Sequence, residues 1–103
     1  MEKEFYVYMM ANRYRGTLYI GVTSDLIKRV WQHKNYHFKG FTQRYQIHHL
    51  VYYESYLCVE ESILREKKLK RWRRAWKFDL IEKGNPYWLD LYAGLGDPGS
   101  SPG

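Results

Sequence analysis

The chain has 103 residues, 45% of them hydrophobic and 27% charged, which suits one globular domain with a modest core and is too short for two. Cys58 is the only cysteine, which excludes an internal disulfide and a zinc site made of several cysteines. Lys and Arg outnumber Asp and Glu by 17 to 11, and the net charge of +6 favours a polyanionic partner, either nucleic acid or an anionic membrane surface. A basic surface that is merely solvated is the alternative.

The first four residues do not resemble a signal peptide, because they lead straight into an alternating strand pattern. No apolar run approaches the ~18 residues that a membrane-spanning helix requires. Together with the lone cysteine, these features predict a soluble, cytoplasmic protein without a membrane partner.

The N-terminal part of the chain predicts a β-hairpin followed by a helix. Residues 5–11 and 17–23 have the composition of strands, and Gly16 supplies a turn between them. Ser24 or Asp25 can cap a helix that runs to about residue 37.

The rest of the chain predicts one more strand, two helices and a tail. Residues 47–54 have a strand pattern, and helices are expected over about 59–72 and 74–83. Residues 86–91 would pack back as an extended segment, and residues 93–103, rich in Gly, Pro and Ser, predict a disordered tail. The ββαβαα order predicts an α+β domain over residues 1–92, with a three-stranded antiparallel sheet flanked by helices.

Two tyrosines of the predicted hairpin face the same side of the sheet. If Tyr8 lies opposite Gly21 and Met10 opposite Tyr19, the two phenols are diagonal neighbours and the bare glycine leaves room over Tyr8. A phenol with a pKa near 10 is a poor base at neutral pH, but nearby cations such as Arg29 and a bound metal would lower that pKa. The alternative is an aromatic pair that only stabilises the sheet.

The first predicted helix carries Arg29 and His33 four residues apart, so both project from one face. An arginine at the edge of a cleft can hold a phosphate through two hydrogen bonds, and the histidine can support a tyrosine or move a proton. The alternative is a solvated helix edge on which Asp25 bridges to Arg29.

The second predicted helix places Glu66 close to the centre of an apolar stripe made by Val59, Ile63 and Leu69. A carboxylate in that position requires a cation, either a metal ion or the basic partner of a structural ion pair. Carboxylate oxygens, completed by water and phosphate, are the ligands that Mg²⁺ prefers.

Basic residues follow Glu66 directly and are interleaved with Trp72 and Trp76. The candidate nucleic-acid-binding residues are Lys67, Lys68, Lys70, Arg71, Arg73 and Arg74. Cations neutralise phosphates whatever the base sequence, and an exposed tryptophan can stack on an unpaired base. At helical spacing, the tryptophans can also belong to the core.

These residues resemble the motifs of the GIY-YIG nuclease family at that family's spacing. Residues 6–8 (Tyr-Val-Tyr) stand at the first motif, with Tyr-Val in place of Gly-Ile, and residues 19–21 (Tyr-Ile-Gly) match the second. The later motif positions are Arg29, His33, Glu66 and Asn85. The resemblance extends from about Phe5 to Leu91, and the chain looks like the small stand-alone bacterial members that resemble the excision-repair nuclease subunit.

The resemblance implies a metal-dependent endonuclease that hydrolyses phosphodiester bonds, with DNA as the expected substrate and DNA repair as the expected setting. Glu66 would hold one divalent cation, Mg²⁺ or Mn²⁺, and no small-molecule cofactor is expected. Tyr8, or alternatively Tyr19, would deprotonate or orient the attacking water. Arg29 would position the phosphate, and His33 would support the tyrosine.

Gly21 and Asn85 have supporting roles in this interpretation, the asparagine as a structural residue near the cleft. The chain lacks the lysine that some members carry after the second motif, and it has no room for a specificity domain, so weak or structure-guided cleavage by a monomer is expected. A nucleic-acid-binding module that does not cut, and an adaptor that recruits a separate nuclease, are the alternative functions.

Overall fold

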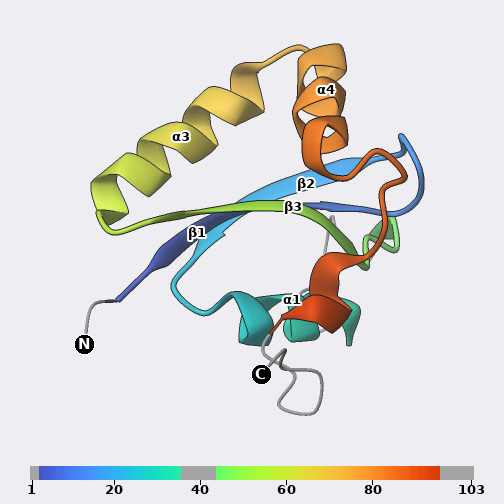
Figure 1. The fold of residues 1–103 in the computed structure, drawn as a ribbon. Helices are drawn as coiled ribbons and strands as arrows, with labels where there is room; N and C mark the ends of the chain where they lie inside the picture. The colour runs from blue at the N-terminus through green and yellow to red at the C-terminus, as the bar shows by residue number, and fades with distance from the viewer. Residues whose placement is uncertain (1–2, 36–43, 96–103) are drawn as a thin grey trace.

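The computed structural model describes residues 3–35 and 44–95, which form a three-stranded sheet with helices on both faces (Figure 1). The strands are β1 (Phe5–Ala11), β2 (Leu18–Thr23) and β3 (His49–Tyr56), and the helices are α1 (Leu26–Lys34), α3 (Val59–Arg71), α4 (Arg74–Gly84) and the 3-10 helix η1 (Leu91–Gly94). This order confirms the predicted ββαβαα arrangement and the α+β class. Every helix in the described ranges is too short or too polar to cross a bilayer.

Several predicted boundaries move in the structure, and β3, expected over residues 47–54, runs from His49 to Tyr56. Helix α1 ends at Lys34, three residues before the predicted end, with Asn35 as its C-cap. Helix η1 takes in the first residues of the predicted tail, since Leu95 donates its backbone N–H to the carbonyl of Tyr92. The remainder of that tail, residues 96–103, lies outside the described residues.

Strand β1 is the middle strand of the sheet, which has the order β2-β1-β3 and is antiparallel throughout. In the hairpin, Tyr8 pairs with Gly21 and Met10 with Tyr19, which confirms the predicted register. The side chains of β1 therefore alternate between two covered faces, and residues 7–11 are all buried. Because β1 has cover on both sides, its sequence is nearly continuous in apolar and aromatic residues.

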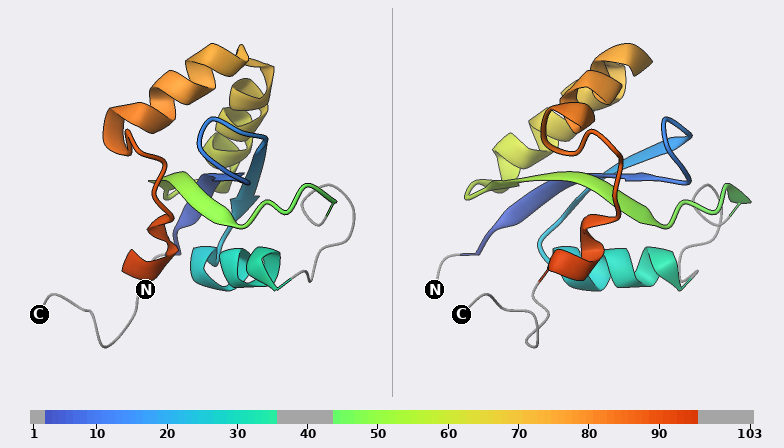
Figure 2. Two further views of the ribbon diagram at one scale, coloured as in Figure 1. Left: turned by 90° about the vertical axis from the view of Figure 1, so that its right-hand side faces the viewer. Right: turned by 45° about the vertical axis from the view of Figure 1, so that its right-hand side comes forward.

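The two faces of the sheet carry separate hydrophobic clusters. Figures 1 and 2 show α3 and α4 over one face and α1 with η1 against the other. Val7 and Met9 pack toward α3 and α4, in a cluster that includes Leu69 and Ile81. The residue between them, Tyr8, belongs to the cluster on the α1 side. The buried odd-numbered residues of β1 thus belong to the cluster under α3 and α4, and its even-numbered residues face the side of the sheet that carries the candidate active site.

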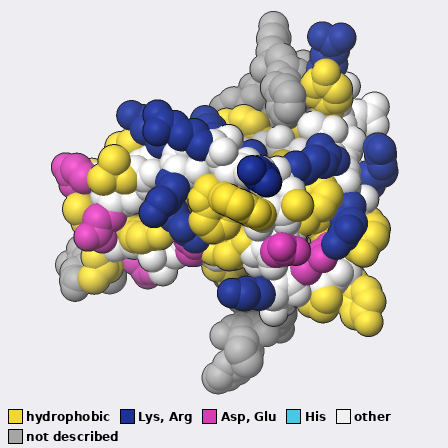
Figure 3. Space-filling view, turned by 90° about the horizontal axis from the view of Figure 1, so that it is seen from above, with side chains coloured by type: hydrophobic (Ala, Val, Ile, Leu, Met, Phe, Trp, Pro, Cys, Tyr) yellow, Lys and Arg dark blue, Asp and Glu magenta, His cyan; other side chains and the backbone are white. Residues whose placement is uncertain are grey.

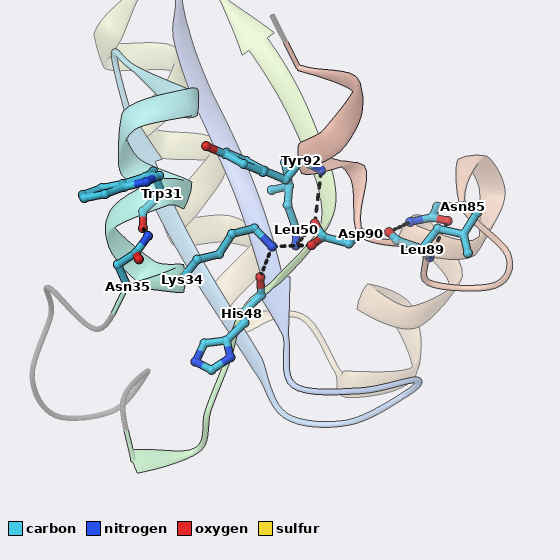
Figure 4. Close-up of polar contacts among 9 residues, drawn as sticks. All are labelled: Trp31, Lys34, Asn35, His48, Leu50, Asn85, Leu89, Asp90 and Tyr92. Atoms are coloured by element: carbon cyan, nitrogen blue, oxygen red, sulfur yellow. Dashed lines mark hydrogen bonds and ion pairs between the residues drawn. The ribbon is translucent and has the colours of Figure 1, made fainter. Parts of the chain in front are cut away.

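The segment after α4 crosses the edge of the sheet and ends beside α1. Buried Asn85 donates from its side-chain amide to the carbonyl of Val51. It also donates to the carbonyl of Leu89, and its side-chain oxygen accepts the N–H of Leu89 (Figure 4). These three bonds fix the turn between α4 and η1 against β3. Asn85 thus fixes a turn beside β3, while its expected place near the cleft stays a prediction.

Asp90 makes the second connection of this segment, at the start of η1. Its carboxylate accepts the backbone N–H groups of Leu50 and Tyr92 and pairs with the ammonium group of Lys34, which also donates to the carbonyl of His48 (Figure 4). Burial raises the pKa of Asp90, but these hydrogen bonds outweigh it and leave the pKa below its usual value. One carboxylate therefore joins η1, β3 and the C-terminal end of α1.

Candidate active site

Gly21 lies directly against the ring of Tyr8, across the hairpin. A Cβ atom built on Gly21 would be 2.6 Å from the Tyr8 hydroxyl oxygen and 2.7 Å from its Cζ atom. Both distances are shorter than any side chain tolerates, so only glycine allows Tyr8 to occupy this place. The glycine of the second motif is thus explained by contact with the tyrosine of the first.

Tyr8, Tyr19 and His33 form a compact cluster between the hairpin and α1. The Tyr8 hydroxyl is 3.1 Å from Nε2 of His33, in a buried hydrogen bond. The ring centroids are 5.0 Å apart for Tyr19 and His33, and 6.2 Å apart for Tyr8 and Tyr19. The two predicted tyrosines and the predicted histidine are therefore neighbours, although the chain separates Tyr8 from His33 by 25 residues.

Helix α1 positions His33 and Arg29 through its capping and its buried stripe. Asp25 is the N-cap, and its side chain accepts the N–H of Lys28. Leu26, Val30 and His33 are the buried positions of the helix, and their spacing of four and three residues turns one face toward the sheet. Arg29 lies half-buried at the border of that face.

The electrostatics of the cluster differ from the sequence expectation in one respect. Burial raises the pKa of Tyr8 well above its ordinary value and Tyr19 raises it further, while the charge and hydrogen bond of Arg29 act in the opposite direction. Burial outweighs the arginine, so Arg29 alone does not make this phenol an effective base. Burial and then Arg29 lower the pKa of His33 to about 4, so the imidazole is neutral at neutral pH.

Burial also distinguishes the two tyrosines. Tyr8 is completely buried, whereas Tyr19 is half-buried at the same cluster. A water molecule at the surface of the cluster therefore reaches Tyr19 more easily than Tyr8. Tyr8 is placed to hold its neighbours through its hydroxyl group.

Glu66 lies on α3, in the layer on the other side of the sheet. The buried positions of α3 are Ser62 and Leu69. Ile63 is 40% exposed, so the prediction that it belongs to a buried apolar stripe is wrong. Glu66 lies beside the buried face, with 15% of its side chain exposed, and its carboxylate is 2.6 Å from the ammonium group of Lys70.

The orientation of α3 shows which edge of the sheet Glu66 approaches. Arg65 donates to Glu54 of β3, so this flank of the helix points to β3. At about 100° per residue, Glu66 lies on the opposite flank of the face defined by Ser62 and Leu69, which points to β2. Strand β2 is an edge of the sheet and carries Tyr19 on its other face. Glu66 thus lies on the flank of α3 that is turned toward the β2 edge, in the layer opposite the tyrosine cluster.

The donor set around Glu66 fits a magnesium ion only in the form that leaves most ligands to solvent and substrate. Within the described residues, no group of three or more His, Cys, Asp or Glu side chains is close enough to enclose a metal ion. Mg²⁺ commonly takes one or two carboxylates and keeps several waters or substrate phosphates. A single, mostly buried carboxylate beside the mobile chain end of a lysine agrees with that mode.

The candidate nucleic-acid-binding residues that follow Glu66 are all exposed but differ in whether they have an intramolecular partner. Lys70 pairs with Glu66, and Arg74 donates to the backbone carbonyls of Arg15 and Gly16 in the hairpin turn. The other four predicted nucleic-acid-binding residues are exposed, namely Lys67, Lys68, Arg71 and Arg73. The predicted binding set therefore divides into two residues with intramolecular partners and four on the outer side of α3 and its exit.

The sequence interpretation missed the polar network between β3 and α3. Glu54 accepts hydrogen bonds from Tyr52, Tyr56 and Arg65. Burial raises the pKa of Glu54, but these donors outweigh it and keep the pKa low. The alternation of Tyr52, Glu54 and Tyr56 on one face of the strand was the available signal, but its helical partner is not apparent from spacing.

The three-stranded antiparallel sheet with its flanking helices is consistent with the fold of one family of catalytic domains, which a family comparison identifies. Residues 4–79 match the model of the GIY-YIG catalytic domain, and the chain belongs to the GIY-YIG family.

Relatives of similar size carry the same sequence pattern over most of their length. A UPF0213 protein of Staphylococcus epidermidis is 32% identical over 84 residues, which cover 82% of this chain and 100% of the relative. A UPF0213 protein of Staphylococcus saprophyticus is 32% identical over 79 residues, covering 77% and 95%, and one of Bacillus pumilus is 30% identical over 83 residues, covering 81% and 85%. No solved structure gave a significant match.

Proposed function

We propose that the protein is a metal-dependent endonuclease that hydrolyses phosphodiester bonds in DNA, with weak or structure-guided specificity. The observation that carries the proposal is the buried Tyr8–His33 hydrogen bond beside Arg29 and against the bare backbone of Gly21, in a member of a nuclease domain family. An aromatic pair that only stabilised the sheet would need neither a buried imidazole nor an arginine next to it.

In this proposal Tyr19, the half-buried tyrosine, orients the attacking water through its hydroxyl oxygen. Tyr8 acts as a positioning residue, because its buried hydroxyl holds His33 in place. Burial supports this division over the sequence interpretation, which favoured Tyr8 for the contact with water. The neutral imidazole of His33 can accept a proton from either neighbouring phenol as the water is deprotonated.

Arg29 binds the scissile phosphate and couples binding to the chemistry of His33. The charge of Arg29 is one of the two causes that lower the pKa of His33. Burial is the larger cause and remains when substrate binds, but a phosphate that neutralises Arg29 removes the smaller part of the lowering, so the pKa of His33 rises and the imidazole becomes a better proton acceptor.

Glu66 would hold one Mg²⁺ or Mn²⁺ ion at the β2 edge. When bound, such an ion supplies stabilisation of the negative charge that develops on the phosphate and the leaving oxygen. The side chain of Lys70 is exposed and can move from Glu66 to solvent or to a substrate phosphate when the carboxylate takes a metal. Glu66 would thus exchange one cation for another instead of being exposed as an unpaired charge.

The test is cleavage of labelled single-stranded, duplex and branched DNA, with matching RNA substrates, in Mg²⁺, in Mn²⁺ and in EDTA. We expect the wild type to cut in either metal and to be inactive in EDTA. Glu66→Gln keeps the shape of the side chain and is expected to reduce the rate at least about 100-fold while retaining binding.

Lys70→Gln is the matched control, because it also breaks the Glu66–Lys70 ion pair. If Glu66 serves only that pair, both substitutions have equal effects on cleavage and stability. If Glu66 holds a metal, Lys70→Gln lowers the rate by about fivefold at most, the value of a partly exposed pair. Binding without cutting by the wild type, in every metal and on every substrate, would instead support a module that binds nucleic acid and does not cut. The Glu66–Lys70 pair is the observation that favours this second function.

A further inference from the structure

We propose that the outer side of α3 and α4, opposite the layer of the tyrosine cluster, binds an unpaired nucleic-acid strand. The inference rests on the proposed function in that it takes nucleic acid as the substrate, and it adds a second contact surface to the candidate active site. The surface, here called the α3–α4 groove, consists of two adjoining hollows of about 700 and 170 Å³ that share Trp72 as a wall.

The larger hollow extends along the β3 side of α3 and is lined mainly by cations and apolar side chains. Its principal lining residues are Tyr56, Leu64, Arg65, Lys68, Arg71 and Trp72. The smaller hollow continues over α4, between Trp72 and Trp76 and up to Lys83. Because one indole borders both hollows, they lie next to each other on the surface of the two helices.

Positive charge dominates this groove. Figure 3, which looks down on the α3 and α4 layer, shows Lys and Arg side chains around a hydrophobic patch, with acidic side chains at the left end and others beside the patch at its lower right. Glu61 and Asp79 are the acidic residues among those that line the two hollows. Lys68 and Arg71 form no ion pair with any acidic side chain in the described part of the chain. Their charges are thus available to phosphates, unlike those of Lys70 and Arg74.

Trp76 supplies the aromatic surface. It is 51% exposed, although tryptophan usually buries most of its area, and it meets Trp72 edge-on with centroids 6.1 Å apart. The guanidinium groups of Arg65 and Arg73 lie 5.2 and 5.5 Å from the ring centroids of Trp72 and Trp76. The edge-on arrangement leaves indole surface open between cations, which is the combination that binds single strands by base stacking and phosphate contacts.

An unpaired strand fits these features better than a duplex or an acidic peptide. The bases of a duplex are stacked on one another and present no free face to Trp76. An acidic peptide would satisfy Lys68 and Arg71 but has no planar group for the exposed indole. The strand is therefore the one occupant that uses both the charge and the aromatic surface.

The groove is separate from the candidate active site. The tyrosine cluster lies on the opposite face of the sheet, and Glu66 lies on the β2 flank of α3, whereas Arg65 and Tyr56 place the groove toward β3. A strand in the groove therefore does not occupy the place of the scissile phosphate. The groove would hold one part of a nucleic-acid substrate while another part of that nucleic acid reaches the β2 edge.

The test measures binding of fluorescent oligothymidylate and of a blunt hairpin duplex by anisotropy, in EDTA so that no cleavage occurs. The variants are Trp76→Ala, Trp76→Phe and a matched control, Trp31→Ala, which removes a comparably exposed tryptophan (46%) from α1 in the opposite layer. We expect Trp76→Ala to weaken single-strand binding by about fivefold or more, Trp76→Phe to restore most of it and Trp31→Ala to leave it unchanged. Circular dichroism confirms that each variant is folded.

Salt dependence tests the cations. The double substitution Lys68→Gln and Arg71→Gln should reduce the slope of log K against log salt concentration by about 1.4, since each single-strand phosphate contact contributes about 0.7. Equal affinity of the wild type and Trp76→Ala, or an equal loss with Trp31→Ala, would overturn the proposal. Competition by oligoglutamate as strong as that by oligothymidylate would also overturn it and assign the groove to acidic peptides.

The outcome is distinguishable from that of the nuclease test. A wild type that binds the single strand through Trp76 but cuts nothing would overturn the nuclease and leave the groove. A wild type that cuts DNA, but binds single strands independently of Trp76, would overturn the groove and leave the nuclease.

Discussion

Replacing Gly21 with alanine would insert a methyl group into the most tightly restricted contact of the candidate active site. The new Cβ would lie 2.6 to 3.0 Å from three atoms of the Tyr8 side chain. That side chain is completely buried, its hydroxyl is bonded to His33, and a planar ring has no flexible end that can move aside. Either the two strands separate at this position or Tyr8 loses its hydrogen bond.

The magnitude follows from two opposing effects. Overpacking a buried contact costs about 1–3 kcal/mol, while alanine in place of a strand glycine recovers roughly 0.5–1 kcal/mol of chain entropy. The net loss is therefore up to about 2.5 kcal/mol, which lowers the midpoint of thermal unfolding by up to roughly 20 °C in a domain of this size.

Urea and thermal unfolding of Gly21→Ala, beside Gly84→Ala, provide the assay. A Cβ atom on Gly84 meets nothing within 4 Å, so this control should be neutral or slightly stabilised. The cleavage rate of Gly21→Ala should fall even at temperatures where the variant is fully folded, because Tyr8 and His33 no longer form their hydrogen bond. A Gly21→Ala protein with wild-type stability and activity would refute the reasoning, since it would show that the hairpin accommodates the methyl group without moving Tyr8.

Three further predictions concern single residues. Because the pKa of His33 is lowered in the folded protein, from 6.5 to about 4, the unfolded state takes up its proton first and the stability contributed by the neutral imidazole is lost as the pH falls from about 6.5 to 4. Urea midpoints across that range should fall less steeply for His33→Gln than for the wild type, and parallel curves would contradict the assignment. Asn85→Ala removes the partner of one buried and two part-buried backbone groups and should cost about 2 kcal/mol of unfolding free energy, measured by urea, with little recovery in Asn85→Asp, which lacks the amide donor. Asp25→Ala removes the N-cap of α1 and should cost about 1 kcal/mol, whereas Asp25→Asn, which keeps a side-chain acceptor, should cost much less; equal losses would exclude the cap as the cause.

The local parts of this structure could be predicted from the sequence. The hairpin register follows from alternation and turn position, and it alone places Tyr8 against Gly21. The spacing of Arg29 and His33 also puts them on one helix face without further information. Both inferences need only the period of a strand or a helix, which is a property of neighbouring residues.

The parts that depend on distant residues could not be predicted in this way. Ile63 has the spacing of a core position, yet the helix is rotated so that Ser62 is buried instead, with Arg65 bonded to Glu54 on β3. The spacing of the basic residues after Glu66 also does not indicate that Arg74 donates hydrogen bonds to backbone carbonyls of the hairpin turn. Contacts between different helices and strands decide which residues are buried and which partners they have. The spacing of residues along one helix or strand carries no information about those contacts.

The bonds of Asp90 bear on where a minimal functional domain ends. The family model matches residues 4–79, but the carboxylate of Asp90 lies beyond that limit and joins the first helix to the third strand through Lys34 and Leu50. His33 is the residue immediately before Lys34. A shortened chain that stopped after α4 would keep every motif residue up to Glu66 and still release the end of the helix that carries the imidazole. The boundary for expression of a fragment that keeps the candidate active site intact therefore belongs after η1, and residues 85–94 support that candidate site although they contain none of its proposed reactive groups.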